Sequence, residues 1–515
     1  MLALGVSLAL SACSAPNSGV APGPGDKAAT QWDALVDAPL TLSFTSAGAP
    51  PSPQSLDFSA SFTGPAGQTL SAPGYWDGGN QFAINFNPPA EGRWAYRTSS
   101  VEPSLNGLSS AVTVGPQPAG RHGALRASSL NPKMLAYADG TSRLVLGFEA
   151  GFLPALATAD PSLGKLNAML DLIESGGFTL VSLDAFARDT PWCPGATKCG
   201  PNDYGPPGVN AFDAGGGVNP AYFAALQRTV AALDGRGLQA NVRLYNFNKG
   251  VAYPAAGSVN DAAYLRQVVA RLAAYHVMFD YAKESKYEPQ AGVIVQRMNA
   301  VRALDPYGRL ETVNDRGSGA PALNFLSLQT HANWRSTVFA ARATGLPVLV
   351  SEYGYEYGPG GPGDVTFPGT ADDPTNISGL QEAQRALEII AAGGYPGYYS
   401  ARTAWDVMQA SPAPAGVSVF RRIADLTAGL DWQSMTPNDA LSPGGARVIA
   451  SGAAVFAYAP GGGPFPLTRP AGAWHGAALD LTTGARAELG PLSGAATIQP
   501  PAGWSGPLIV RLNAS

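Results

Sequence analysis

The spacing of apolar residues changes twice along this chain and divides it into three regions. From about residue 30 to 117, apolar and polar side chains alternate in short runs such as LTLSF, QFAINF and AVTVG, with turn residues between them. Strict alternation is the pattern of β-strands that bury one face. Residues 30–117 are therefore predicted to form a small antiparallel β-sandwich of the immunoglobulin-like kind.

From about residue 120 to 440, short apolar runs alternate with Ala- and Leu-rich helical stretches. Eight runs are typical of buried strands: RLVLGFE, FTLVSLDAF, LQANVRLYNF, VMFDYAKE, RLETVND, NFLSLQTH, PVLVSEYG and GYPGYYSARTAW. The clearest helical stretches cover residues 162–174, 220–236, 261–275, 290–303 and 379–392. This alternation predicts an α/β fold, a (β/α)8 or TIM barrel. The link DRGSGAPAL between the fifth and sixth strands is too short for a full helix.

From about residue 446 to 515 the alternation of apolar and polar residues returns, between Gly- and Pro-rich turns. This region predicts a second antiparallel β-sandwich. The barrel is therefore expected to be flanked by an N-terminal and a C-terminal sandwich domain.

The N-terminus has the features of an export signal. Residues 1–13 are apolar and small and end in LSAC, which resembles the processing box of bacterial lipoproteins, where Cys13 would carry the lipid. Residues 14–29 are rich in Pro, Gly and Ser and predict a flexible tether. We expect a chain that is exported and anchored in the cell envelope by lipid, although an ordinary cleaved signal with a chance cysteine would also fit. In an exported chain, the closely spaced Cys193 and Cys199 are expected to form a local disulfide.

Composition narrows the function. Hydrophobic residues make up 45% of the chain and charged residues 13%, with a net charge of −5 and no dense basic run. These values indicate a well-buried globular protein and argue against nucleic acid as its partner. Four scattered histidines and the lack of a phosphate-binding loop favour no metal and no other cofactor.

Motifs in the N-terminal region carry a resemblance. The run FTGPAGQTLSAPGYWDGGNQFAINFNPPAEGRWAYRTSS closely resembles a sandwich module, a domain of unknown function, found ahead of many bacterial glycoside-hydrolase barrels. We interpret the aromatic residues of this run mainly as core and turn residues. The C-terminal region is similar to a module named for collagen binding, which often follows such barrels. The matching residues are Phe62, Pro65, Gly67, Tyr75, Trp76, Asp77, Gly78, Gly79, Phe86, Pro88, Gly92, Trp94 and Tyr96.

The segment LPVLVSEYGYEYG is the most informative of the chain. A β-branched apolar run ends abruptly at Glu352, and three tyrosines follow it, at 353, 355 and 357. The C-terminal tips of barrel strands carry catalytic groups, and aromatic side chains such as Tyr355 stack on sugar rings. Glu352 is therefore predicted to be catalytic; the alternative is a surface glutamate that caps the next helix.

A second carboxylate is needed for glycosidic cleavage, one acting as acid/base and the other as nucleophile. The resemblance, to secreted bacterial glycoside hydrolases with a clan-A-type TIM barrel, implies an acid/base at the end of the fourth strand and a nucleophile at the end of the seventh. Glu284 and Glu352 stand at these ends. However, the family's usual residue before the acid/base is Asn, and here it is Lys283. Asp280 is an alternative acid/base, on the same face of a regular strand.

The other strand ends predict a sugar-binding rim. His331 ends the sixth strand, and aromatic residues near these ends suit a sugar platform. An Arg inside a barrel is normally paired, so Arg243 could hold a carboxylate ionised. A long loop over residues 188–218 is expected to shape the cleft. The predicted substrate-binding residues are His331, Trp334, Arg243, Tyr245, Asn246, Tyr355, Trp405, Asp406, Glu149 and Asp184.

The sequence thus predicts a retaining glycoside hydrolase of an oligo- or polysaccharide, with Glu352 as nucleophile and Glu284 as acid/base. A glycan-binding or adhesion protein without catalysis is the alternative, favoured by the missing Asn. Lyase or transglycosylase activity would use the same carboxylates. The acidic balance of the chain mildly disfavours polyanionic glycans.

Overall fold

The structure is a computed structural model. It describes residues 32–186, 211–212, 217–247, 253–288, 292–315, 323–357, 376–404, 408–469 and 472–515. The predicted signal with Cys13, the tether, Cys193, Cys199, Trp405 and Asp406 lie outside these described residues.

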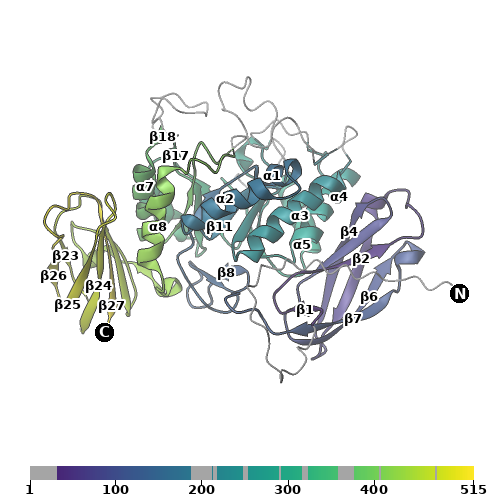
Figure 1. The fold of residues 1–515 in the computed structure, drawn as a ribbon, viewed down its shortest axis with the longest axis horizontal. Coiled ribbons are helices and arrows are strands. Elements are labelled where there is room, and N and C mark those ends of the chain that lie inside the picture. Colours follow the sequence, from purple (N-terminus) through teal and green to yellow (C-terminus); the bar gives the residue numbers. More distant parts are fainter. Residues whose placement is uncertain are drawn as a thin grey trace, which may run out of the picture.

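A parallel sheet of eight strands forms the centre of the molecule (Figure 1). The sheet has the order β14-β13-β12-β11-β10-β19-β16-β15, so the strands follow one another around an almost closed barrel. All eight predicted strands are present. Their bounds are β10 (Gly147–Glu149), β11 (Leu180–Asp184), β12 (Gln239–Arg243), β13 (Val277–Asp280), β14 (Leu310–Thr312), β15 (Leu326–Gln329), β16 (Val348–Glu352) and β19 (Tyr395–Tyr398).

The barrel closes at a seam between β14 and β15. These two strands are not paired as a ladder; a single parallel bridge joins Asn314 to Ser327. The hydroxyl of Thr312 adds contacts across the seam, since it donates to the carbonyl of Phe325 and accepts from the Ser327 amide. As the short link predicted, no helix joins β14 to β15 in the residues described there.

Helices cover the outside of the sheet. The five predicted helices are all present, within a few residues of the expected bounds, whereas α1, α6 and α8 were not predicted. Sequence signals fix several of their starts: Asn219 and Ser258 cap α3 and α4, and Ser378 forms a capping box with Gln381 at α7. The helices are α1 (Leu153–Ala159), α2 (Gly164–Ser175), α3 (Pro220–Gly235), α4 (Val259–Leu272), α5 (Val293–Leu304), α6 (Trp334–Arg342), α7 (Gly379–Ala391) and α8 (Ala415–Thr427).

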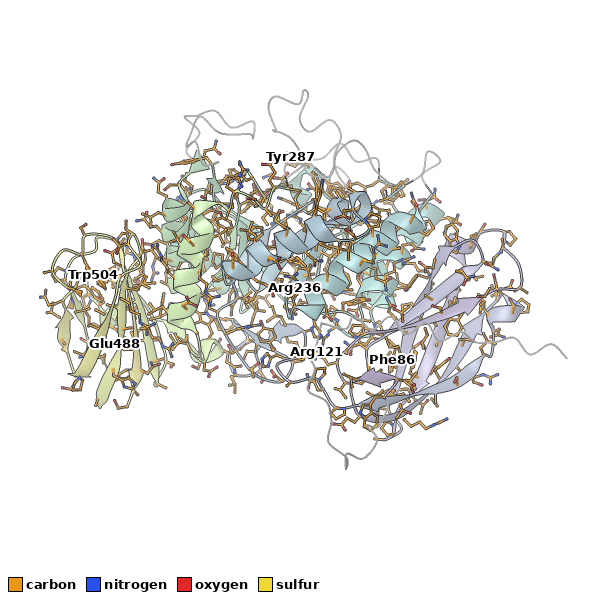
Figure 2. All side chains as sticks on the ribbon, viewed as in Figure 1. Phe86, Arg121, Arg236, Tyr287, Glu488 and Trp504 are labelled. Atoms are coloured by element: carbon orange, nitrogen blue, oxygen red, sulfur yellow. The ribbon has the colours of Figure 1, made fainter. Side chains whose placement is uncertain are left out.

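The N-terminal region folds into a seven-stranded sheet with its own aromatic core, which includes Phe86 (Figure 2). Its pairing is antiparallel except between β1 and β7. The antiparallel strands are as expected, while their assignment to a sandwich stays a prediction. The strands are β1 (Ala34–Leu35), β2 (Leu40–Thr45), β3 (Phe58–Thr63), β4 (Thr69–Gly78), β5 (Gln81–Phe86), β6 (Gly92–Ser100) and β7 (Ser109–Gly115).

This sheet is fastened to the barrel through α4. The Arg271 guanidinium of α4, 1% exposed as a side chain, lies 2.7 Å from Asp77 and 4.1 Å from the ring centre of Tyr75. The amide of Asn85 donates to the Arg271 carbonyl at 2.6 Å. Arg121, at the junction of the sheet and the barrel (Figure 2), adds an ion pair of 2.6 Å with Asp234 of α3.

The C-terminal region forms a six-stranded sheet and a separate strand pair around a third core. It lies beside α7 and α8 at the opposite end of the molecule from the N-terminal sheet (Figure 1). Its predicted antiparallel strands are present, and here too the sandwich assignment stays a prediction. The strands are β20 (Thr436–Pro437), β21 (Arg447–Ala450), β22 (Ala454–Ala459), β23 (Phe465–Leu467), β24 (Ala473–Asp480), β25 (Arg486–Ser493), β26 (Ala496–Ile498) and β27 (Leu508–Ala514).

Two short strand pairs complete the fold. The hairpin β8 (Leu125–Ala127) and β9 (Leu135–Tyr137) precedes the first barrel strand, and β17 (Tyr355–Glu356) pairs with β18 (Asn376–Ile377) after the seventh. Among the described residues, no helix is both long and apolar enough to cross a membrane.

Candidate active site

The ends of the barrel strands bring five charged side chains to one edge of the sheet. Glu149 ends β10, Asp184 ends β11, Arg243 ends β12, Asp280 ends β13 and Glu352 ends β16. All five are buried. Because the strands are parallel, their carboxyl ends meet at the same edge, and this is the edge where βα barrels carry their active sites.

Arg243 holds two of these carboxylates. Its Nε donates to Asp184 at 2.6 Å, while its two terminal nitrogens bind both oxygens of Glu149, one of them at 2.8 Å. Burial raises the pKa of Glu149, although Arg243 and Lys283 act against it. A fork of this kind fixes the guanidinium in position. As predicted, the buried Arg243 is paired. Its hydrogen bonds connect the ends of β10, β11 and β12.

The backbone makes room for this cluster at Gly151. A Cβ atom at this position would lie 2.9 Å from Arg243 Nη2, 3.0 Å from Asp184 Oδ2 and 3.2 Å from Glu149 Oε1. A glycine at position 151 therefore leaves the space that these charged groups occupy, and any larger residue would clash with them.

Glu352 is surrounded by groups that favour its ionised form. Lys283 Nζ lies 2.9 Å from Oε2, Gln329 donates to Oε1 at 3.0 Å, and the Tyr355 hydroxyl also donates to Oε1. Burial raises the pKa of Glu352, but Lys283, Tyr355 and His331 outweigh it and hold the pKa below its ordinary value. Glu352 is therefore a carboxylate at neutral pH, as a nucleophile must be.

Lys283 forms its ion pair with Glu352 and not with its neighbour Glu284. The lysine side chain is buried, pairs with Glu352 and lies 5.4 Å from the ring centre of Tyr399. Burial lowers the pKa of Lys283, but Glu352 raises it above its ordinary value. Lys283 thus acts on Glu352, the predicted nucleophile.

Glu284 follows β13 in an unusual conformation. It has a φ of 53° and precedes the 3-10 turn of Ser285–Tyr287. Its amide donates to Asn314 Oδ1 at 3.3 Å, its residue exposure is only 6%, and its Oε2 has no hydrogen-bond partner among the described residues. Non-glycine residues in this left-handed region are strained and cluster at functional sites. A buried, unpartnered carboxylate oxygen is the group that a ligand would satisfy.

Asp280, the alternative acid/base, sits deeper. Burial raises its pKa to about 6, against Arg243 and backbone hydrogen bonds from Asn314 and Ala282. The Asn314 amide donates to it at 3.1 Å. Its pKa suits an acid catalyst, but its carboxylate already accepts backbone hydrogen bonds.

The remaining predicted residues divide into three groups. His331 lies near Glu352, and its ring centre is 5.5 Å from that of Tyr355. Asn246 is buried and forms a parallel bridge with Lys283. Tyr245 instead turns outward, where its hydroxyl donates to Asp261 of α4 at 2.8 Å, so the structure does not bring it to the carboxylates. Trp334 lines a separate cavity of about 320 Å³ between α6, α7 and β22.

Asn314 and Gln329 were missed by sequence reasoning. Asn314 Nδ2 donates to the hydroxyls of Ser327 and Ser351, both at 3.0 Å, and so ties the fifth, sixth and seventh strands together. Both residues stand at or just beyond strand ends, in RLETVND and NFLSLQTH. The same strand-end rule that selected Glu352 would have found them.

Over the described residues, no group of three or more His, Cys, Asp or Glu is arranged to hold a metal ion.

Comparison with known proteins finds chains of similar fold. Residues 30–101 match the model of a domain of unknown function, DUF5060. No curated protein matches the chain. A protein described as a putative glycoside hydrolase from Bacteroides vulgatus ATCC 8482 is similar in structure, with a TM-score of 0.74 at 17% identity, over 94% of this chain and 99% of that one.

A second solved structure, a family 5 glycoside hydrolase from the same organism, has a TM-score of 0.59 at 15% identity, over 76% of this chain and 93% of that one. At these identities the likeness concerns the fold. The chain therefore has a glycoside-hydrolase-like α/β barrel, with the DUF5060 match at its N-terminus.

Proposed function

We propose that this chain is a retaining glycoside hydrolase that cleaves O-glycosidic bonds of an oligo- or polysaccharide. One observation supports the proposal: a buried glutamate follows the fourth strand and another ends the seventh, and the two differ in their contacts. Glu352 is ion-paired and ionised, whereas Glu284 has an oxygen without a partner among the described residues. Cleavage needs such a pair of carboxylates.

In the proposed mechanism, Glu352 attacks the anomeric carbon as Glu284 gives its proton to the leaving oxygen, and the glycosidic C–O bond breaks. Glu284, now a carboxylate, removes a proton from water. That water attacks the anomeric carbon, releases Glu352 and restores the starting state. Lys283 keeps Glu352 ionised between turnovers, and Gln329 and Tyr355 fix its orientation.

The test starts from a panel of aryl glycosides. A 2-deoxy-2-fluoro glycoside of the accepted sugar should trap the glycosyl-enzyme, and peptide mass spectrometry should find the label on Glu352. Glu352→Ala should lose activity and regain it with azide, giving a glycosyl azide of inverted configuration. Label on another residue would refute the nucleophile assignment.

Glu284 and Asp280 are separated by leaving-group dependence. Glu284→Gln should slow glycosides with poor leaving groups by roughly 10² to 10⁴-fold and largely spare dinitrophenyl glycosides, which need no proton. Asp280→Asn is the matched variant. If it gives this pattern and Glu284→Gln does not, Asp280 is the acid/base.

A second candidate function is glycan binding without turnover. The ion pair between Lys283 and Glu352 favours it, because a carboxylate held by a close cation is a weaker nucleophile although it stays ionised. This function predicts that the protein retains an oligosaccharide on an array but releases no reducing ends from it after long incubation.

We also propose that the chain is exported and lipid-anchored through Cys13, on the basis of the LSAC box. Metabolic labelling with a radioactive fatty acid should mark the wild-type protein and not Cys13→Ser. Equal labelling of both would refute the anchor.

A further inference from the structure

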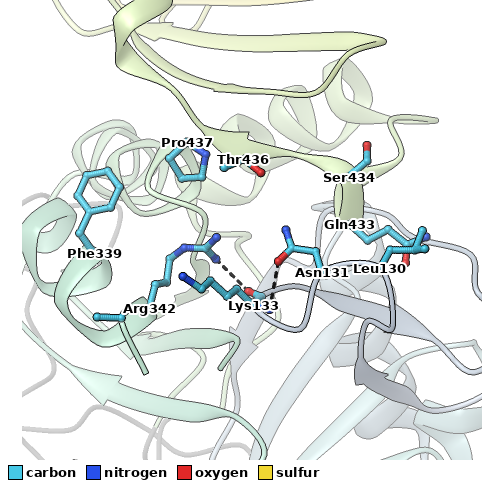
Figure 3. Close-up of a pocket in the computed structure, with 10 residues that line it drawn as sticks. Leu130, Asn131, Lys133, Phe339, Arg342, Gln433, Ser434, Thr436 and Pro437 are labelled. Carbon is cyan, nitrogen blue, oxygen red and sulfur yellow. Dashed lines mark hydrogen bonds between the residues drawn. The ribbon is translucent and has the colours of Figure 1, made fainter. Parts of the chain in front are cut away.

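A cavity of about 720 Å³ lies at the end of the barrel opposite to the carboxylates. It is lined by the loop before β9, by the C-terminal end of α6 and by the segment that enters the C-terminal sheet (Figure 3). Helices of a βα barrel run antiparallel to the strands, so the last residues of α6 lie near the strand starts. The contact between Arg342 and Gly393, just before β19, agrees with this placement.

The charges that line this cavity are all positive. Lys133 and Arg342 contribute two cations, and no carboxylate belongs to the described lining. Neither cation forms an ion pair with a described residue; the hydrogen bonds of Arg342 go to backbone carbonyls and to the Met134 sulfur. The nearby Asp439 pairs with Arg335 instead. Two cations without a counter-charge beside one cavity favour an anion inside it.

Arg342 is the more telling of the two cations because it is buried, at 6% exposure. One terminal nitrogen donates to the carbonyls of Lys133 at 2.9 Å and Gly393 at 2.6 Å, and the first of these bonds is drawn in Figure 3. Its Nε and its other terminal nitrogen make no hydrogen bond with the described residues. Burial lowers the pKa of Arg342, as expected for a cation without an acidic neighbour.

The other lining groups are hydrogen-bond donors and apolar surfaces. Asn131 accepts from the Lys133 amide through its Oδ1, which leaves its NH₂ group available among the described contacts. Phe339 and Leu130 are 42% and 73% exposed, and Pro437 lies near Phe339 (Figure 3). The cavity is far larger than a bare oxyanion and within the size range of small-molecule sites. It therefore suits an anion that carries an organic body.

We propose that this cavity binds an acidic saccharide, with the carboxylate or sulfate of the sugar between Lys133 and Arg342 and its ring against Phe339. The choice of a saccharide over other organic anions rests on the proposed glycan-directed function, whereas the anionic group rests on the cavity alone. The site would hold a charged glycan at a distance from the bond being cleaved. Its two cations would offset, locally, the repulsion between an anionic glycan and a chain of net charge −5.

The experiment measures binding calorimetrically at low ionic strength, in the Glu352→Gln background so that turnover plays no part. The probes are glucuronate, galacturonate and glucose 6-sulfate, with glucose and galactose as neutral counterparts and inorganic sulfate as the bare ion. At least one acidic sugar should saturate the protein where its neutral counterpart does not. Lys133→Met should weaken this binding about tenfold or more.

Lys133→Met is expected to fold, because the lysine side chain makes no hydrogen bond with the described residues. Arg342→Lys keeps the charge but loses the planar guanidinium. It should weaken binding less than the double variant Arg342→Lys/Lys133→Met does. Arg93→Met, on an exposed strand of the N-terminal sheet, is the matched control and should bind as the parent does.

The proposal is overturned if no acidic sugar binds more tightly than its neutral counterpart, or if Lys133→Met binds as tightly as the parent. It is also overturned if inorganic sulfate binds as tightly as the acidic sugars, since the ring would then contribute nothing. Failure of Glu352 labelling with intact acidic-sugar binding would refute the proposed hydrolysis and leave this site standing; the reverse result would refute only the site.

Discussion

At the scale of single residues, four charged side chains at the barrel edge could be predicted, because the last residue of a buried strand is easily recognised in a sequence. These residues are Glu149, Asp184, Arg243 and Glu352. The partners of these residues could not be predicted. The pairing of Lys283 with Glu352 depends on the direction of a long side chain just beyond a strand, and the sequence permitted either face. Tyr245 is predicted to belong to the rim because it lies along the third predicted strand, but its hydroxyl donates to Asp261 of α4, outside the barrel.

Removal of the Lys283 charge should shift the pH dependence of the proposed hydrolysis. The pKa of Glu352 is held below its ordinary value, and Lys283 is the strongest group that lowers it. Lys283→Met should therefore raise that pKa, and the acid limb of kcat/KM should shift to higher pH by about one unit or more. The pH–rate profile measures this shift. Lys286→Met, whose lysine pairs with Asp315, is the control and should leave the limb in place.

The charged cluster of Glu149, Asp184 and Arg243 should be disturbed by a single methyl group added at Gly151. Gly151→Ala would put a Cβ within 3.2 Å of three charged side chains, and we expect it to cost about 1–3 kcal/mol of unfolding free energy and most of the activity. Gly235→Ala is the control, since nothing lies within 4 Å of its Cβ position. Urea titrations of both variants measure the cost. Equal midpoints would contradict the crowding argument.

At the scale of elements, the eight strands and five helices followed from periodicity, while α1, α6 and α8 did not. The helix α1 is only seven residues long and its first five residues are all buried, so it shows no amphipathic period. The helix α6 is nine residues long, too short for its period to stand out, and it starts without a side-chain cap. The helix α7, by contrast, has a capping box and a strongly apolar face, and its predicted bounds were nearly correct.

The capping box of α7 gives a test at this scale. The Ser378 hydroxyl accepts from the Gln381 amide at 3.2 Å, and the Gln381 side chain accepts from the Ser378 amide at 2.9 Å. Ser378→Ala should lower the free energy of unfolding by about 1 kcal/mol. Ser418→Ala, within α8 and exposed, should change it by less than about 0.5 kcal/mol. Thermal and urea unfolding compare the two, and similar losses would argue against a capping contribution.

At the scale of the whole molecule, each flanking sheet covers one part of the barrel. The N-terminal sheet is fastened to α4 by Arg271 and to α3 by Arg121, and Arg447 of β21 pairs with Glu388 of α7 at 3.3 Å. The sequence predicted both flanking regions but not which helices they cover, because contacts between residues so far apart in the chain leave no local pattern.

The seam between β14 and β15 has a consequence for how the molecule opens. At this joint one backbone bridge and a few hydrogen bonds, from Glu311, Thr312 and Asn314, take the place of a regular ladder, so the barrel resembles a curved sheet whose two edge strands meet. Local opening starts where few backbone hydrogen bonds must break. In hydrogen–deuterium exchange, the amides of β14 and β15 should therefore exchange well before those of β11 and β12, whose five-residue pairing lies on the side that the N-terminal sheet covers. Uniform exchange around the barrel would mean that the two edges behave as a continuous ladder.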